Sequence, residues 1–480
     1  MLPKISSENK KSISGKRRVC DILIKNAYVI TMDRNRNIYP SGAIAIDNDI
    51  ITAVGSERGI ISKFKTGRII DAGGAPVHPG FIDAHYHTSI HLARGVISEN
   101  PSAKNKISYF DWFNALEDED EYNSALASCV EMVRNGYTTF MEPGTVFEPS
   151  TVAEAAEAIG MRVSLSDPFI WDTKPESLKN LPIIKRAPFN KKRAFKKIGQ
   201  QLKRNASKNP LVTAHICLYG CNSASEELLI AANEIAKKSD VILNTHHNFT
   251  PEEAESDDSR FGKMHNLLYL DKLGILNGRS TFVHMNVIRD DEMQPIIDSG
   301  MSIVWVPGNF QFYSLGLKVR SRMAELLNQR TNVTLGVDTA KIWTFGEMEL
   351  LAYLIARQNG EYISPEKIFE MRTIGASQAL GLGKNIGSIE QHKKADLIIR
   401  TNKLPEAQPG ANIIQEMMLV SRSKSVDTVI VNGQIIYRKG EFTRVDQDLI
   451  YEFARHTSRR IMKKIKYEPK MKWPLKKKII

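Results

Sequence analysis

The sequence has no segment suited to membrane insertion or export. No uninterrupted apolar run approaches the roughly 18 residues that a membrane span needs. Residues 1–18 are rich in Lys and Ser but contain no apolar core, which a secretory signal would require. We therefore expect a flexible basic N-terminus and a cytoplasmic protein.

Cysteine is also scarce. The four cysteines are Cys20, Cys129, Cys217 and Cys221. Their number and scatter argue against a disulfide framework. Cys217 and Cys221 could form half of a metal site, but no second half follows. Reduced thiols that pack in the core are the favoured interpretation.

Acidic residues are fewer than basic residues, and the net charge is +12. Residues 459–478 hold ten Lys or Arg and one acid, so this tail alone contributes +9 and the rest 12 − 9 = +3. A basic tail can contact RNA or acidic lipid. The second basic stretch, residues 185–208, lacks the regularly interleaved aromatics of a base-stacking surface. We therefore predict a solvated tail and expect no nucleic-acid or membrane contact.

Both ends of the chain contain short β-branched runs. Residues 19–30 and 43–46 predict strands near the N-terminus. Residues 428–437 predict a hairpin, because Asn432-Gly433 suits its left-handed turn. We predict that residues 19–77 and 386–445 form one small β-sandwich domain.

The middle of the chain alternates short apolar strands with longer amphipathic stretches. The strand candidates are residues 81–87, 137–142, 161–166, 211–217, 241–246, 280–284, 301–306 and 332–338. Eight such units predict a parallel (β/α)₈ barrel over residues 78–385. A C-terminal helix and the basic tail would occupy residues 446–480.

Sequence motifs predict the first residues of two helices. Ser223 and Glu226 have the spacing of a capping box. Ser364-Pro365 places a cap residue before a proline at the first helical position. We expect a helix to begin at each.

Histidines gather where the predicted strands end. His85 and His87 are two residues apart, so in a strand both point to the same face. His246, His284 and Asp338 also lie at or near strand ends. In a barrel, active-site groups collect at the C-terminal ends of the strands. The pattern predicts that these side chains meet around a divalent cation.

Several of these stretches resemble the amidohydrolase superfamily. Residues 71–87 are similar to its signature, and closest to the branch of cytosine and guanine deaminases and triazine hydrolases. Gly136-Tyr-Thr-Thr, Leu335-Gly-Val-Asp and Ile386-Gly-Ser-Ile-Glu extend the likeness. The resemblance implies a barrel with a composite β domain, a small-molecule substrate and a homo-oligomer.

The resemblance also assigns the metal site. It implies that His85, His87, His246 and Asp338 are ligands and that His284 faces the reacting group. Relatives with two metals carry a lysine at the end of strand four, but residues 211–217 contain none. One divalent ion is therefore expected, with zinc favoured over iron.

These parts predict a mononuclear metal-dependent hydrolase that attacks an sp² carbon with metal-bound hydroxide. Asp338 would take a proton from the attacking water and pass it to the leaving group. His284 would hydrogen-bond the developing negative oxygen.

One departure bears on the reaction. Deaminases of this branch place a ring-protonating glutamate three residues after the strand-five histidine, and here that position is Phe249. We therefore favour hydrolysis of a non-peptide carbonyl C–N bond in an amide, urea, carbamate or lactam. The alternative is deamination or dechlorination of an N-heterocycle, with His247 in place of the missing acid. Glu252 and Glu253 are interpreted as residues of the first turn of a helix.

Three further residues are candidates for substrate binding. His247 follows the strand-five histidine, and Asn309 follows strand seven. Trp343 lies just beyond Asp338 and could cover the site. With aromatic residues nearby, an apolar or aromatic substrate is favoured.

Overall fold

The computed structural model describes residues 17–101, 107–207, 211–262, 264–339, 341–468 and 473. Most of the predicted flexible N-terminus and the end of the basic tail lie outside these residues. Within the described ranges, no helix is both long and apolar enough to cross a membrane.

Short parallel strands form the centre of the α/β fold. They are β8 (Phe81–Asp83), β9 (Tyr137–Met141), β10 (Arg162–Leu165), β11 (Val212–Ala214), β12 (Ile216–Gly220), β13 (Leu243–His247), β14 (Ser280–His284), β15 (Ser302–Trp305) and β16 (Asn332–Leu335). They pair in chain order, as a four-stranded sheet from β8 to β11 and a five-stranded sheet from β12 to β16. Each predicted strand range overlaps at least one observed strand.

The fourth predicted strand, residues 211–217, is divided in two. The amide of His215 bonds the carbonyl of Leu165 beside β10, whereas the amide of Ile216 bonds the carbonyl of Ile242 beside β13. The chain therefore changes its pairing partner at His215, and the residues that the structure describes form nine such strands in place of the eight expected.

The last strand lies beside the first at their C-terminal ends. The amide of Asp338 donates to the carbonyl of His85 over 2.9 Å, and the amide of His87 donates to the carbonyl of Asp338 over 2.9 Å. These bonds bring the ends of β8 and β16 together, although the two are far apart in sequence.

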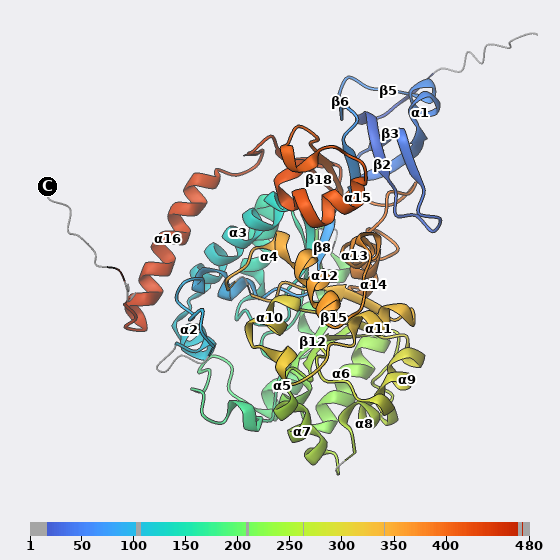
Figure 1. Cartoon of the computed structure of the whole chain (residues 1–480). Coiled ribbons are helices and arrows are strands. Elements are labelled where there is room, and N and C mark those ends of the chain that lie inside the picture. The colour runs from blue at the N-terminus through green and yellow to red at the C-terminus, as the bar shows by residue number, and fades with distance from the viewer. Residues whose placement is uncertain are drawn as a thin grey trace, which may run out of the picture.

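Helices surround these strands (Figure 1). They are α2 (Tyr109–Ala115), α3 (Asp118–Arg134), α4 (Pro149–Ile159), α5 (Lys191–Lys197), α6 (Glu226–Lys238), α7 (Pro251–Arg260), α8 (Asn266–Lys272), α9 (Asp290–Ser299), α10 (Pro307–Phe312), α11 (Met323–Asn328), α12 (Met348–Gln358), α13 (Pro365–Arg372) and α14 (Ile374–Ala379). Helix α13 begins as predicted, because the Ser364 side chain accepts a bond from the amide of Lys367. The predicted start at Ser223 is wrong: the cap of α6 is Ser225, which accepts from the amide of Leu228.

Strands from both ends of the chain pair in one nine-stranded sheet. Its strands are β2 (Ile22–Ile30), β3 (Ile38–Asp47), β4 (Ile50–Ser56), β6 (Ile69–Asp71), β7 (Pro76–Pro79), β17 (Leu397–Arg400), β18 (Val426–Val431), β19 (Gln434–Arg438) and β20 (Glu441–Phe442), while β1 (Arg18–Val19) and β5 (Phe64–Lys65) pair separately and α1 (Glu57–Lys63) and α15 (Ile413–Gln415) lie in the connecting segments. The two ends meet where β7 pairs with β17. Asn432 and Gly433 both have positive φ, as the predicted hairpin turn requires. The domain boundaries at 77 and 386 stay predictions.

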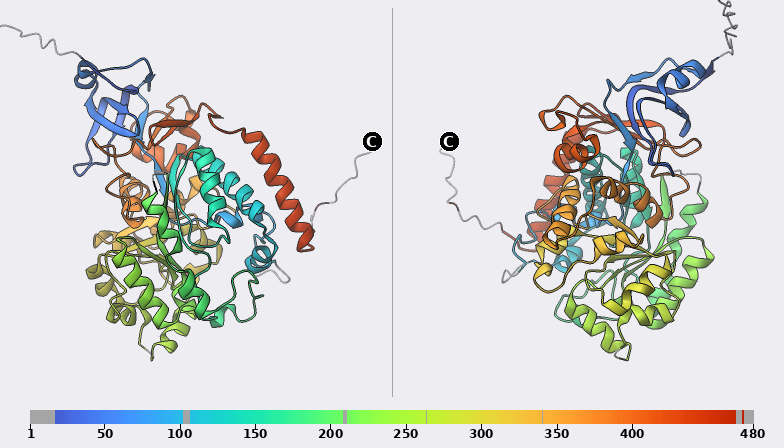
Figure 2. Two further views of the ribbon diagram at one scale, coloured as in Figure 1. Left: turned by 180° about the vertical axis from the view of Figure 1, so that it is seen from behind. Right: turned by 45° about the vertical axis from the view of Figure 1, so that its right-hand side comes forward.

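The C-terminal helix α16 (Gln447–Lys464) packs against α3 (Figure 2). Arg460 forms ion pairs with Glu117 and Asp120, and Lys464 pairs with Glu117 over 3.1 Å. These acids lie at the start of α3, where negative charge is favourable. Part of the basic C-terminal region thus forms ion pairs within the molecule.

Candidate metal centre and active site

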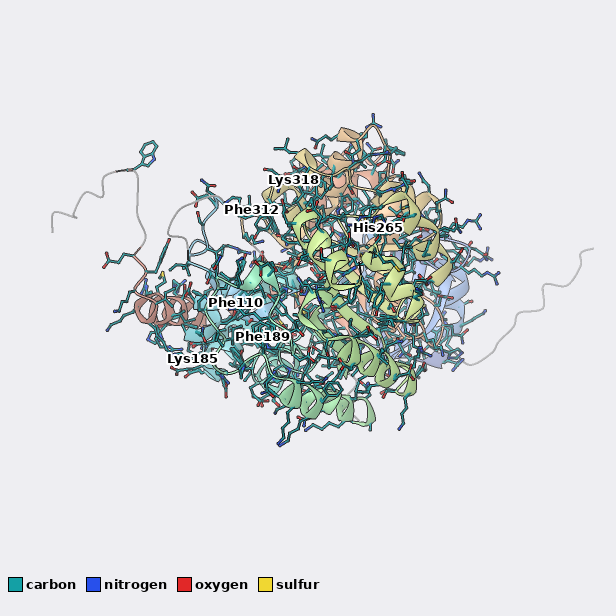
Figure 3. The ribbon with its side chains drawn as sticks, turned by 90° about the horizontal axis from the view of Figure 1, so that it is seen from below. Phe110, Lys185, Phe189, His265, Phe312 and Lys318 are labelled. Carbon is teal, nitrogen blue, oxygen red and sulfur yellow. The ribbon has the colours of Figure 1, made fainter. Side chains whose placement is uncertain are left out.

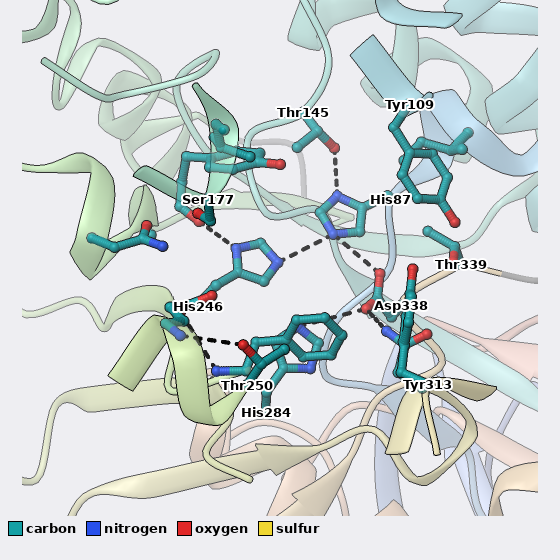
Figure 4. Close-up of a pocket in the computed structure, with 18 of the residues that line it drawn as sticks. His87, Tyr109, Thr145, Ser177, His246, Thr250, His284, Tyr313, Asp338 and Thr339 are labelled. Carbon is teal, nitrogen blue, oxygen red and sulfur yellow. Dashed lines mark hydrogen bonds and ion pairs between the residues drawn. The ribbon is translucent and has the colours of Figure 1, made fainter. Parts of the chain in front are cut away.

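The imidazoles of His85, His87 and His246 converge where β8 and β13 end, and Figure 4 shows those of His87 and His246. The Nε2 atom of His85 lies 3.1 Å from Nε2 of His87, and Nε2 of His246 lies 3.0 and 3.3 Å from those two atoms. His85 and His87 reach this point together because they are two residues apart in an extended chain. The structure therefore brings together three of the four predicted ligands as a compact group.

The hydrogen bonds at Nδ1, the ring nitrogen that points away from the cluster, determine the tautomers of His246 and His87. Nδ1 of His246 faces the carbonyl oxygen of Tyr219, which can only accept, so Nδ1 carries the proton. Nδ1 of His87 lies 2.7 Å from Oγ1 of Thr145, whose hydroxyl donates to Glu142 over 2.8 Å. The Nε2 lone pairs of both rings are thus free and point to a common centre. Burial lowers the pKa of His246 to about 4 and keeps the ring neutral.

This donor set fits a divalent cation. Three neutral imidazoles that face one another repel through their lone pairs, and a cation between them replaces repulsion by coordination. The hydrogen bonds at Nδ1 hold the rings of His87 and His246 in the ligating orientation, as is usual for metal-binding histidines. His85, His87 and His246 are therefore the residues that could hold the metal.

Asp338 and His284 complete the group. Oδ1 of Asp338 lies 3.3 Å from Nε2 of His87, and Oδ2 lies 3.7 Å from Nε2 of His284. Burial raises the pKa of Asp338 to about 6. His284 and Asp338 have positive φ angles of 74° and 64°. Such backbone strain costs about 1–3 kcal/mol per residue and is typical of functional sites.

A cavity of about 280 Å³ opens on this group. The residues that line it are His87, Ile90, Tyr109, Phe113, Thr145, Ser177, Leu178, Tyr219, Gly220, Asn222, His246, Phe249, Thr250, Glu253, His284, Asn309, Tyr313, Asp338, Thr339 and Lys341. Phe249 stands where related deaminases have the glutamate. Its ring centre lies 4.6 Å from that of His284 and 5.2 Å from that of Tyr313. The cavity thus joins an aromatic wall to the polar cluster.

Two of the predicted substrate-binding residues are not among those that line this cavity. His247 is fully buried, with Nε2 3.2 Å from Oδ1 of Asn266, because consecutive residues of β13 face opposite sides. Trp343 is also buried and donates its indole N–H to the carbonyl of Val337. Neither observation supports the predicted contact with a substrate.

The third candidate, Asn309, lines the cavity, but its amide already has partners. Its Nδ2 donates to Oδ2 of Asp338, and its Oδ1 accepts from the ammonium of Lys341 over 2.6 Å. In this arrangement Asn309 orients the Asp338 carboxyl.

Sequence reasoning missed two charged residues in the cavity. Glu253 belongs to the first turn of α7, as expected, but its side chain also lines the cavity. Burial raises the pKa of Glu253 to about 8, and nearby Asp257 adds to the shift. Lys341 follows Asp338 by three residues, and burial lowers its pKa to about 8. Glu253 lies seven residues after His246, too far for the strand pattern to indicate its direction.

The strand-end histidines and carboxyl around one cavity are the arrangement of a metal-dependent hydrolase. The profile of the amidohydrolase family matches residues 77–436, or 360 of the 480 residues. The chain belongs to this family, and it is a hydrolase that acts on C–N bonds other than peptide bonds.

Similar proteins extend over nearly the whole chain. A 5-methylthioadenosine/S-adenosylhomocysteine deaminase of Syntrophobacter fumaroxidans is 28% identical over 448 residues, which are 92% of this chain and 98% of the relative. The crystal structure of an adenosine deaminase from Xanthomonas campestris with bound zinc has a TM-score of 0.82 and 21% identity, and covers 93% of this chain and 100% of its own. The zinc complex of an atrazine chlorohydrolase from Arthrobacter aurescens has a TM-score of 0.77 and 20% identity, and covers 91% and 100%. The resemblance to the deaminase and triazine hydrolase branch is confirmed.

Proposed function

We propose that this protein is a single-zinc deaminase that removes the exocyclic amino group of an N-heterocycle of the aminopurine type. The observation that supports this reaction most is Glu253, a carboxyl group in the same cavity as His246, His284 and Asp338. Its raised pKa keeps it protonated near neutral pH, so it can donate a proton to a ring nitrogen.

The sequence alone favours carbonyl C–N hydrolysis, because the acid position holds Phe249. The relatives named as deaminases favour the alternative. Glu253 is compatible with both the absence of an acid at Phe249 and the deaminase relatives. It lines the cavity although it lies one helical turn further along the chain. We therefore prefer deamination to cleavage of an amide, urea, carbamate or lactam.

The proposal includes the finer architecture. We take β8–β16 to be one closed (β/α)₈ barrel in which β11 and β12 act as a single strand. His85, His87, His246 and Asp338 would hold one zinc, with iron as the alternative ion. When bound, such an ion lowers the pKa of water to about 7 and so supplies hydroxide at neutral pH. A homo-oligomeric state stays a prediction.

The residues of the chain account for the protons. Oδ2 of Asp338 takes a proton as the water oxygen forms its bond to the ring carbon. Glu253 protonates the adjacent ring nitrogen, which makes that carbon more electrophilic, and regains a proton from the hydroxyl oxygen as the carbonyl forms. His284 hydrogen-bonds the attacking oxygen through Nε2. Asp338 then passes its proton to the amine, the C–N bond breaks, and ammonia leaves.

Glu253→Gln is expected to reduce deamination by a factor of about 10²–10³, within the range for a positioned acid. The amide keeps the shape of the side chain but has no proton to deliver at neutral pH. Ammonia release from aminopurines and aminotriazines would be measured for the metal-loaded protein, with amides and ureas assayed in parallel. Glu252→Gln is the matched control, because Glu252 precedes Glu253 in the same turn but is exposed and paired with Lys318.

The pH profile provides a second test of Glu253. Its folded-state pKa is raised, so the active acid form is present below about pH 8 and is lost as the pH rises through that value. The wild type and Glu252→Gln should therefore lose activity above about pH 8, and Glu253→Gln should lack this decline. A wild type that cleaves amides or ureas but releases no ammonia from the heterocycles would refute the proposed reaction.

His284→Ala is expected to reduce turnover by about 10²–10³-fold, as for the loss of a donor to a developing oxyanion. Its Nε2 faces the Asp338 carboxyl across the cavity, so removal of the ring should affect kcat more than KM. Steady-state kinetics with metal content measured on the same samples would test this. A loss below threefold at unchanged metal content would contradict the assigned role.

A further inference from the structure

Lys341 places a positive charge in the cavity that the proposed reaction does not use. Its ammonium lies at the wall formed with Asn309 and Tyr313. It follows Asp338 by only three residues, so it belongs to the segment that leaves the end of β16. The charge therefore lies close to the place where a substrate would react.

The neighbours of Lys341 leave part of its donor capacity unused. One N–H bond goes to Oδ1 of Asn309 over 2.6 Å, and Oη of Tyr313 lies 3.4 Å away. An ammonium has three donors. Aromatic rings form the rest of the surroundings, with the ammonium 4.7 Å from the Tyr313 ring centre and 5.0 Å from that of Phe312.

No carboxylate neutralises this ammonium directly in the part of the chain that the structure describes. Asp338 attracts it electrostatically, but that carboxyl is engaged by Asn309 and faces His87 and His284. A partly desolvated lysine without an anionic partner is costly, and a ligand anion would offset this cost. The aromatic surroundings also strengthen any charge pairing, because they exclude water.

We propose that Lys341 selects substrates that carry an anionic oxygen, such as a carboxylate on the heterocycle, beside the amino group that is removed. This inference rests on the proposed deaminase function and names the substrate class within it. The aromatic wall of Phe249 and Tyr313 packs against the ring, and Lys341 pairs with the anionic oxygen. Substrate recognition then has one apolar and one charged component.

The test compares two aminated heterocycles that differ only by a carboxylate. For the wild type, we expect kcat/KM about 10- to 100-fold higher for the carboxylated compound, as for one charge-assisted hydrogen bond. Lys341→Met should abolish this preference mainly by raising KM for the carboxylated compound, so that the ratio of the two kcat/KM values falls to about one. A change in kcat that acts through Asn309 and Asp338 applies to both compounds and leaves this ratio unaltered. Lys341→Gln provides a second neutral variant if the methionine protein does not fold.

The control is Lys318→Met, which makes the same change of charge at an exposed lysine paired with Glu252 (Figure 3). It should keep the preference for the carboxylated compound. If Lys341 only orients Asn309 and Asp338, its variants will keep the wild-type ratio of the two kcat/KM values, and the inference is overturned.

A binding measurement separates this inference from the proposed function. Calorimetry would compare carboxylated and neutral heterocycles that carry hydrogen in place of the amino group, so no reaction is needed. The wild type should bind the carboxylated analogue about 10- to 100-fold more tightly than Lys341→Met does, with equal binding of the neutral one. If this difference appears but no amine is hydrolysed, the deaminase proposal fails and the role of Lys341 stands. Equal binding of the carboxylated analogue by both proteins overturns the role of Lys341.

Discussion

The double substitution His85→Ala/His87→Ala is expected to remove the tightly bound metal and reduce turnover to background. Both rings contribute Nε2 atoms to the three-histidine cluster, and His246 lies 3.0 and 3.3 Å from them. Of the four proposed ligands, their loss leaves only His246 and Asp338, too few for the usual four-coordinate site. Elemental analysis of chelator-free protein should give about one divalent ion per wild-type chain and almost none in the variant.

The matched control removes two histidines elsewhere. His265 is partly exposed beside Asp291, and His456 is exposed on α16. His265→Ala/His456→Ala should keep the metal and the activity. Two tightly bound ions per wild-type chain, or full metal content in the variant that lacks His85 and His87, would contradict the single-ion proposal.

Asp338→Asn is expected to lower turnover by about 10⁴-fold, the upper end of the contribution of a positioned acid–base group. Asparagine keeps the shape of the side chain and can still accept the hydrogen bond from Asn309, but it cannot take the proton from water. The three histidines should hold at least part of the metal. Single-turnover rates and metal content, measured on the same preparation, would separate loss of the base from loss of the ion.

Asp240→Asn is a suitable control for this change. Asp240 is exposed, pairs with Arg279 and has a positive φ that asparagine tolerates. It should behave as the wild type. If Asp338→Asn keeps its metal and still turns over within tenfold of the wild type, Asp338 is not the proton acceptor proposed above.

Local patterns predicted much of the fold because they depend on neighbours in the sequence. Alternation placed His85 and His87 on one face, and Asn432-Gly433 supplied the two left-handed residues of a hairpin turn. The same alternation implies that His246 and His247 face opposite sides of the strand. The strand pattern therefore does not favour a substrate contact by His247 if His246 is the ligand. The break at His215 could not be predicted, because it depends on which strands lie on either side.

The missing proton donor shows the limit of motif reasoning. The sequence correctly shows that Phe249 occupies the position of the usual glutamate, but this does not exclude an acid elsewhere in the cavity. Glu253 comes from the first turn of α7, and its direction depends on how that helix packs beyond β13. Under the proposed function, Glu253 takes the role of the motif glutamate from a different place in the chain.

The sequence by itself determined the family, the hydrolytic chemistry and the candidate ligands, because strand periodicity and the strand-end motifs are local properties of the chain. Only the tertiary structure decided which other side chains share the cavity. His247 and Trp343 are buried and are not among the residues that line it, whereas Glu253 and Lys341 are. The physical reason is that burial and the approach of distant segments set both the direction and the proton affinity of a side chain. Neither quantity is encoded in the spacing of residues along the chain.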